Sequence, residues 1–237
     1  MKNLALILIL AFALGCKKDA TDPTPIVGKR LSSVTRENRP YMTFEYQKDV
    51  LVKENYYMMC ETNPADEFVY EYSGGTLSKL KTTMRSIYSS LAALCDPKGG
   101  MKLEETFTYN SKGQLTKVIR TDNTTEFVYN AKGLVEKQII GGGETPRVST
   151  FEYDSRGNLI KENNFYGGTT HYTYDNKINP YYTINQRPQW ISPFNKSPNN
   201  VLKATGSYTF ERSYKYDADG YPTEVLEDNK FVYKYNY

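Results

Sequence analysis

The stretch FEYDSRGNLIKE, residues 151–162, has the sequence of a β-hairpin. Phe151 and Tyr153 alternate with acidic residues, an alternation that is typical of a half-buried strand. Asp154 can accept a hydrogen bond from the backbone two residues later and so begin a turn. Gly157 supplies the positive φ that ends a type I turn with a bulge. The stretch therefore predicts two antiparallel strands, the second opening at Leu159.

This hairpin pattern recurs along the chain. Glycine stands in register in FTYNSKG (107–113), FVYNAKG (127–133) and YKYDADG (214–220), and weaker copies occur at 44–46, 70–75, 172–175 and 231–233. The spacing of about 20 to 24 residues fits one hairpin per repeat. The sequence predicts an all-β fold, an antiparallel up-and-down meander of about 14–16 strands. So many strands exceed a usual open sheet, so we expect it to curve or close into a barrel.

The tyrosine-aspartate pairs at 153–154, 174–175 and 216–217 resemble the YD repeats of the RHS family. The segment 175–180 (DNKINP), together with the stretch that follows it, resembles a Bacteroidota lipoprotein family of unknown function that is described as porin-like in fold. Both resemblances imply a design of strands and turns, and neither implies an activity. Strands rich in tyrosine, lysine and glutamate on both faces do not form the apolar band of a lipid-facing wall.

The N-terminus has the pattern of an exported protein. A basic start and the apolar run 4–14 predict a signal peptide over residues 1–15. The stretch 13–16 (ALGC) resembles a bacterial lipobox, which implies that Cys16 is lipidated and attaches the chain to a membrane. Residues 16–28 are then a flexible tether, and residues 29–237 form a single β-meander domain. The alternative is an ordinary signal peptide with an incidental cysteine.

The start KKD after Cys16 resembles that of surface lipoproteins of the Bacteroidota. We therefore expect an outer membrane lipoprotein that faces either the cell surface or the periplasm. In such an oxidising compartment the two other cysteines, Cys60 and Cys95, could form a disulfide, and the alternative is two buried thiols.

An irregular insertion interrupts the meander at residues 179–200 and contains four prolines and the only tryptophan. An irregular insertion of this length in a compact domain is uncommon and is often functional. Its aromatic residues could stack on sugar rings or anchor a protein partner, or they could fill the interior of the curved sheet. The candidate ligand-contacting residues are Tyr181, Tyr182, Trp190 and Phe194.

Little in the sequence points to catalysis. His171 is the only histidine, so catalytic triads and multi-histidine metal sites are excluded. Phosphate-binding and dinucleotide-binding motifs are missing, and a net charge of +3 without a basic tract argues against nucleic-acid binding. We expect no cofactor and no metal, and not an enzyme. Paired carboxylates remain an alternative. The acidic strand residues are interpreted as solvated strand faces: Glu104, Glu105, Glu152, Glu162, Glu211 and Glu224.

These observations predict a lipid-anchored cell-envelope protein, monomeric and non-catalytic, that acts as a binding or scaffold module for a glycan or an envelope protein. One alternative is a glycan-degrading enzyme with paired carboxylates. The other, implied by the RHS resemblance, is a shell around a partner polypeptide.

Overall fold

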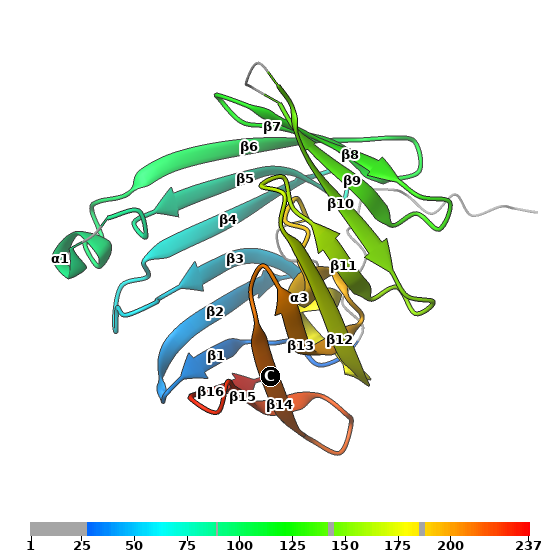
Figure 1. Cartoon of the computed structure of the whole chain (residues 1–237). Helices are drawn as coiled ribbons and strands as arrows, with labels where there is room; N and C mark the ends of the chain where they lie inside the picture. Colours follow the sequence, from blue (N-terminus) through cyan, green and yellow to red (C-terminus); the bar gives the residue numbers. More distant parts are fainter. Residues whose placement is uncertain (1–27, 89, 142–144, 185–187) are drawn as a thin grey trace, which may run out of the picture.

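The computed structural model describes residues 28–88, 90–141, 145–184 and 188–237. Sixteen antiparallel strands follow one another around a closed barrel, and β1 pairs with β16 to complete it (Figure 1). The strands are β1 (Ser33–Arg36), β2 (Arg39–Gln47), β3 (Val50–Tyr56), β4 (Asp66–Ser73), β5 (Thr76–Met84), β6 (Met101–Tyr109), β7 (Leu115–Ile119), β8 (Thr124–Tyr129), β9 (Val135–Ile140), β10 (Arg147–Tyr153), β11 (Leu159–Asn163), β12 (Thr169–Ile178), β13 (Asn199–Gly206), β14 (Phe210–Tyr216), β15 (Pro222–Glu227) and β16 (Phe231–Asn236). The predicted all-β meander of 14–16 strands is confirmed, and the sheet is closed.

The described residues also include three short helices that are not part of the barrel wall. They are α1 (Leu91–Leu94), α2 (Pro180–Thr183) and α3 (Pro193–Lys196). The helix α1 lies in the connection between β5 and β6, and α2 and α3 belong to the insertion between β12 and β13. No helix among the described residues is long and apolar enough to cross a membrane.

The predicted hairpin turn has the expected geometry. Asp154 Oδ1 accepts hydrogen bonds from the backbone N–H groups of Arg156 and Asn158, each at 2.9 Å. Gly157 has φ +89°, and the register shifts by one residue at Tyr153. Equivalent bonds fix the turns that begin at Asn110, Asn130 and Asp217. They also fix the turn that begins at Asn164, although no tyrosine directly precedes this residue in the sequence. The same hydrogen bonds in each turn therefore explain why each copy of the sequence pattern forms one hairpin.

Inward-facing tyrosines satisfy their hydroxyl groups on the neighbouring hairpin. Tyr174, at the end of its hairpin repeat, donates a hydrogen bond of 2.5 Å to the carbonyl of Leu159 on β11. The same contact, at 2.7–2.9 Å, joins Tyr46 to Leu31, Tyr72 to Leu51, Tyr129 to Leu115, Tyr214 to Val201 and Tyr237 to Pro222. Each bond reaches a carbonyl where the local bulge or strand start leaves it accessible. These six tyrosines therefore keep their hydroxyl groups paired inside the barrel, as burial requires.

The outer wall carries ion pairs between adjacent strands. Lys79 lies 2.8 Å from Glu104, across β5 and β6. Equivalent pairs are Lys117–Glu126, Lys161–Glu152, Lys203–Glu211 and Lys215–Glu224, with N–O distances of 2.6–3.2 Å. A wall in contact with lipid would instead present an apolar band. The outer face of the barrel is therefore suited to water.

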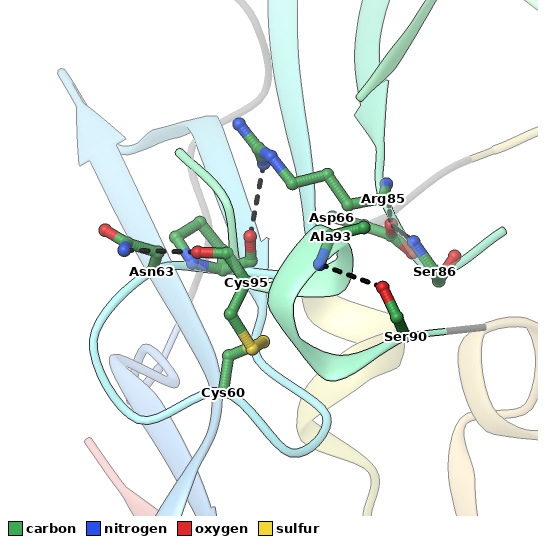
Figure 2. The surroundings of a disulfide bond; sticks show 9 residues. Cys60, Asn63, Asp66, Arg85, Ser86, Ser90, Ala93 and Cys95 are labelled. Carbon is green, nitrogen blue, oxygen red and sulfur yellow. Dashed lines mark hydrogen bonds between the residues drawn. A yellow bond between two sulfur atoms is a disulfide. The ribbon is translucent and has the colours of Figure 1, made fainter. Parts of the chain in front are cut away.

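The two ends of the barrel differ. At one end, here the Gly28 end, Lys29 forms ion pairs of 2.7 and 2.6 Å with Asp217 and Asp219 in the β14–β15 turn. At the other, here the disulfide end, Cys60 in the β3–β4 loop is bonded to Cys95 after α1, with the Cα atoms 5.5 Å apart (Figure 2). The structure thus adopts the disulfide rather than the two free thiols. Closing a loop of 35 residues, the bond stabilises the fold by about 2–4 kcal/mol.

Candidate functional site

The insertion begins and ends at the Gly28 end of the barrel. Asn179 holds its two ends together: its backbone N–H donates to the carbonyl of Pro198 at 3.0 Å, and its Nδ2 donates to the carbonyls of Ser197 and Phe194 at 2.7 and 2.6 Å. The Ser197 hydroxyl in turn accepts from the backbone N–H of Leu159 at 3.0 Å. The base of the insertion is therefore fixed to the wall of the barrel.

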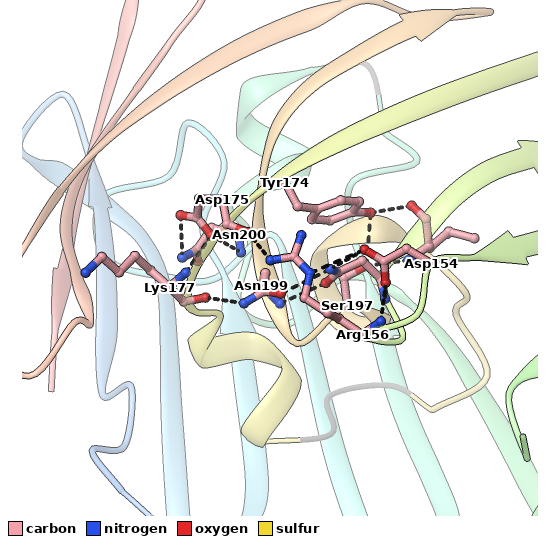
Figure 3. A network of polar contacts seen from close by, with 10 residues as sticks. Asp154, Arg156, Tyr174, Asp175, Lys177, Ser197, Asn199 and Asn200 are labelled. Carbon is pink, nitrogen blue, oxygen red and sulfur yellow. Dashed lines mark hydrogen bonds and ion pairs between the residues drawn. The ribbon is translucent and has the colours of Figure 1, made fainter.

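A polar network at the same end clamps β12 to β13 (Figure 3). The carboxylate of Asp175 accepts from the backbone N–H of Asn200 at 3.0 Å and from its Nδ2 at 3.1 Å. Asn199 Nδ2 donates to the carbonyl of Lys177 at 3.0 Å, and Arg156 donates to the carbonyl of Asp175. These bonds fix the two points where the insertion leaves and rejoins the sheet.

From this base the insertion reaches across the interior. Tyr181 lies 6.2 Å from Phe44 and 5.9 Å from Tyr235 between ring centroids. Further along, Gln189 donates a hydrogen bond of 2.6 Å to Glu105 and accepts one of 3.1 Å from Gln138. The insertion therefore acts as an internal plug, which is one of the two alternatives that the sequence left open.

Two of the six acidic residues interpreted as solvated do not fit that interpretation. Glu105 is only 4% exposed, because it occupies an inward position of β6, and it pairs with Arg120 as well as Gln189. Glu162 is half-buried and accepts from the Tyr172 hydroxyl at 2.9 Å, and burial raises the pKa of its carboxyl. The other four lie in the outer ion pairs: Glu104, Glu152, Glu211 and Glu224.

Between the plug and the wall lies a cavity of about 500 Å³ that is open to solvent. Its lining combines the plug with β2, β3, β4, β5, β14 and β16, and eight of the lining side chains are aromatic: Tyr41, Tyr56, Phe68, Tyr181, Trp190, Phe194, Tyr233 and Tyr235. Most of the strand residues in the lining, such as Tyr56 and Asp66, lie where their strands reach the disulfide end. This cavity is the candidate functional site.

The aromatic rings of the cavity pack mainly edge to face. Tyr41 lies 4.9 Å from Tyr56 and 5.3 Å from Tyr233 between centroids, and Trp190 lies 6.2 Å from Phe68. The hydroxyls of Tyr41 and Tyr56 are 2.8 Å apart and share a hydrogen bond. Burial raises the pKa of Tyr56, so its hydroxyl stays protonated at neutral pH and able to donate.

The charged groups of the cavity are already compensated. Arg212 donates to Glu227 at 2.7 Å, and its guanidinium lies 4.3 Å from the centroid of the Phe194 ring. Asp66 Oδ1 accepts from the backbone N–H groups of Arg85 and Ser86 at 2.9 and 3.0 Å. The cavity therefore offers aromatic faces, hydroxyls and one hydrogen-bonded carboxylate at its rim, and Arg212, the one cation in the described lining, is already paired.

The structure brings three of the four aromatic candidates together. Tyr181, Trp190 and Phe194 line the cavity, and Trp190 keeps 43% of its surface exposed. Tyr182, in α2 and 46% exposed, is not part of the described lining. The strand residues that complete the site carry only the ordinary alternation of a strand in the sequence, so sequence reasoning did not single them out.

The remaining candidates lie elsewhere. His171 is an exposed residue of β12. Among the described residues, no three His, Cys, Asp or Glu side chains are placed to hold a metal ion. Cys16, the signal peptide and the tether up to residue 27 lie outside the described residues.

Comparisons with known proteins show the fold alone. No protein-family model matches the chain, and no curated protein matches it in sequence. A porin-like protein from Bacteroides uniformis has a similar structure, with a TM-score of 0.56, 16% identity, and coverage of 92% of this chain and 99% of that one. A porin-like protein from Bacteroides vulgatus matches with a TM-score of 0.41 and 10% identity over 89% of this chain and 99% of that one.

The Tc holotoxin pore of Photorhabdus luminescens also matches, with a TM-score of 0.35 and 13% identity over 80% of this chain. The chain spans 9–12% of the length of the Tc toxin chains that it matches. The similarity to the Bacteroides uniformis protein agrees with the resemblance to porin-like proteins noted in the sequence.

Proposed function

We propose that this chain is a lipid-anchored protein of the outer membrane that binds a ligand, without catalysis, in the aromatic cavity of its barrel. The cavity between the plug and the wall is the observation that carries the proposal. Its volume lies within the range of small-molecule sites, and its lining has the combination of aromatic faces and a few convergent polar groups that such sites share.

The outer wall supports a barrel that stands in water beside the membrane. Ion pairs such as Lys161–Glu152 and Lys203–Glu211 cross the strands where a membrane-spanning barrel would be apolar. The plug fills the interior that a pore would need. In this proposal the porin-like barrel encloses the binding cavity, and a lipid on Cys16 attaches the protein to the membrane.

The distribution of acids supports binding over hydrolysis. A glycosidase needs two carboxyl groups on either side of the bond that it breaks. Asp66 is the one carboxylate among the described residues of the lining, and it accepts two backbone hydrogen bonds. Glu105 is engaged by Gln189 and Arg120 beneath the surface. The plug also argues against a shell around a partner polypeptide, because it occupies interior space that the partner would need.

Replacing Trp190 with alanine tests the binding site. We expect the variant to fold and to lose ligand binding by at least tenfold, because the indole is 43% exposed and forms part of the lining. The measurement is a glycan-array and pull-down screen with soluble protein that starts at Asp19. Tyr182→Ala is the matched control, since it removes a ring from the same insertion outside the described lining, and it should bind normally. Equal binding by both variants and the parent would refute the site.

Replacing Cys16 with alanine tests the anchor. We expect the variant to be released from the membrane fraction into the soluble fraction, because acyl chains on Cys16 would be its attachment. Fractionation of cells, followed by immunodetection, measures this. A variant that stays in the membrane and is processed normally contradicts lipid anchoring and leaves the cavity proposal untouched.

A further inference from the structure

We infer that the cavity is a blind pocket that takes the terminus of a neutral glycan chain, and that its mouth lies at the end of the barrel opposite the attached end. This inference rests on the proposed binding function and specifies the ligand and the direction from which it enters.

The closed end of the pocket follows from the plug. Toward the Gly28 end, the space among Asn179, Tyr214 and Tyr235 shrinks to a void of about 10 Å³. That is about the room of a single water molecule. Asn179 bonds both ends of the plug across this region, so among the described residues the pocket does not continue here as a passage wide enough for a polymer. Only the end of a chain fits such a pocket.

The chemistry of the lining selects a neutral, hydroxylated ring. Aromatic rings offer apolar faces to the C–H groups of a sugar, and the Tyr41–Tyr56 hydroxyl pair can both donate and accept. The carboxylate of Asp66 can accept from a sugar hydroxyl. Because Glu227 already pairs with Arg212, an anionic ligand would meet no free cation among the described lining residues. A purely apolar ligand would displace water from these hydroxyls and from the carboxylate without offering a hydrogen bond in return, which is costly.

The direction of entry follows from the two ends of the barrel. The chain enters the barrel at the Gly28 end, where Lys29 pairs with the β14–β15 turn. The rim residues Asp66, Met84 and Ser86 lie at the disulfide end. A lipid on Cys16 would therefore attach the barrel at its Gly28 end, and the mouth lies at the opposite end. The volume of about 500 Å³ admits about two sugar rings, and further rings would extend into solvent.

Trp190 provides a direct measure, because the only tryptophan of the chain lines the pocket. Protein that starts at Asp19 is first applied to an array of neutral and acidic glycans attached through their reducing ends. The neutral glycan bound best is then titrated as free oligomers of two to six units, while Trp190 fluorescence is recorded. We expect affinity to change less than about threefold beyond two units, and to fall at least tenfold when the terminal sugar is capped by a bulky group. Tyr182→Ala should behave as the parent.

Other outcomes overturn the inference. Affinity that keeps rising with each added unit, or equal binding of capped and uncapped chains, would show a groove that holds internal segments. Binding of acidic glycans alone would contradict the neutral ligand. If no glycan binds but the pull-down captures a molecule that Trp190→Ala loses, the glycan inference fails and the proposed binding function stands. If Trp190→Ala changes nothing in either assay, both fail.

Discussion

Raising the pH from 10 to 11 is expected to unfold the barrel. Burial holds the pKa of many interior tyrosines above the ordinary value of about 10, as for Tyr72, whose pKa is raised to about 12. Burial raises the pKa in the same direction at five more interior tyrosines: Tyr153, Tyr174, Tyr181, Tyr214 and Tyr235. In the unfolded chain these hydroxyls lose their protons near pH 10, whereas in the barrel they keep them.

The direction and the size of the expected change in folding free energy follow from the difference between the folded and unfolded pKa values. A folded pKa above the unfolded one gives stability that is complete below pH 10 and is lost as the pH rises toward the folded pKa. Each tyrosine whose folded pKa lies well above 11 costs about 1 kcal/mol of folding free energy between pH 10 and 11, so five of these residues, Tyr235 excepted, together cost about 5 kcal/mol. A domain is usually stable by only about 5–15 kcal/mol.

The measurement is a pH titration followed by far-UV circular dichroism and by tyrosinate absorbance. The exposed tyrosines ionise first, and the rest of the absorbance change should then coincide with the loss of dichroism in one steep transition, since ionisation of the interior tyrosines requires unfolding. Tyr174→Phe should lower its steepness by about one proton, whereas Tyr166→Phe, at a residue that is 83% exposed, should leave it unchanged. If the dichroism stays constant while the absorbance rises near pH 10 by more than the exposed tyrosines can account for, the interior tyrosines are accessible and the barrel is not tightly packed.

The sequence predicted those parts of the fold that depend on local chemistry. A turn such as 154–158 is encoded within a few residues, through one acceptor side chain and one glycine, so the hairpins and their number could be found. Closure followed from that number. The pairing of β1 with β16 joins residues about 200 positions apart, and no local pattern specifies that contact.

The site was harder to predict, because the inward and outward faces of these strands carry similar types of residue. In MKLEETFTY the adjacent acids Glu104 and Glu105 give no hint that one faces water and the other the plug. The insertion, in contrast, was conspicuous through its prolines and Trp190, and three of its four aromatic candidates line the cavity. The rest of the lining depends on where the plug ends within the barrel, which only the three-dimensional packing determines.

Replacing Arg212 with methionine is expected to lower the free energy of unfolding by about 3–5 kcal/mol. Arg212 and Glu227 are both largely buried, and the side-chain exposures are 14% and 18%. Removing the guanidinium leaves a buried carboxylate with only the Tyr233 hydroxyl, at 3.2 Å, as a donor among the described residues, and an uncompensated buried charge is strongly destabilising. The stacking of the guanidinium on Phe194 is lost at the same time.

Urea unfolding of four variants separates these causes. The double variant Arg212→Met with Glu227→Gln should recover most of the lost stability, because the desolvated charge is gone and a methionine fills the space. The matched control is the neighbouring outer pair, 45% and 66% exposed, where Lys203→Met or Glu211→Gln should cost less than about 1 kcal/mol. If Arg212→Met costs no more than Lys203→Met, the interior is wet enough to solvate the carboxylate. The pocket would then hold its ligand through water rather than through dry contact with aromatic rings.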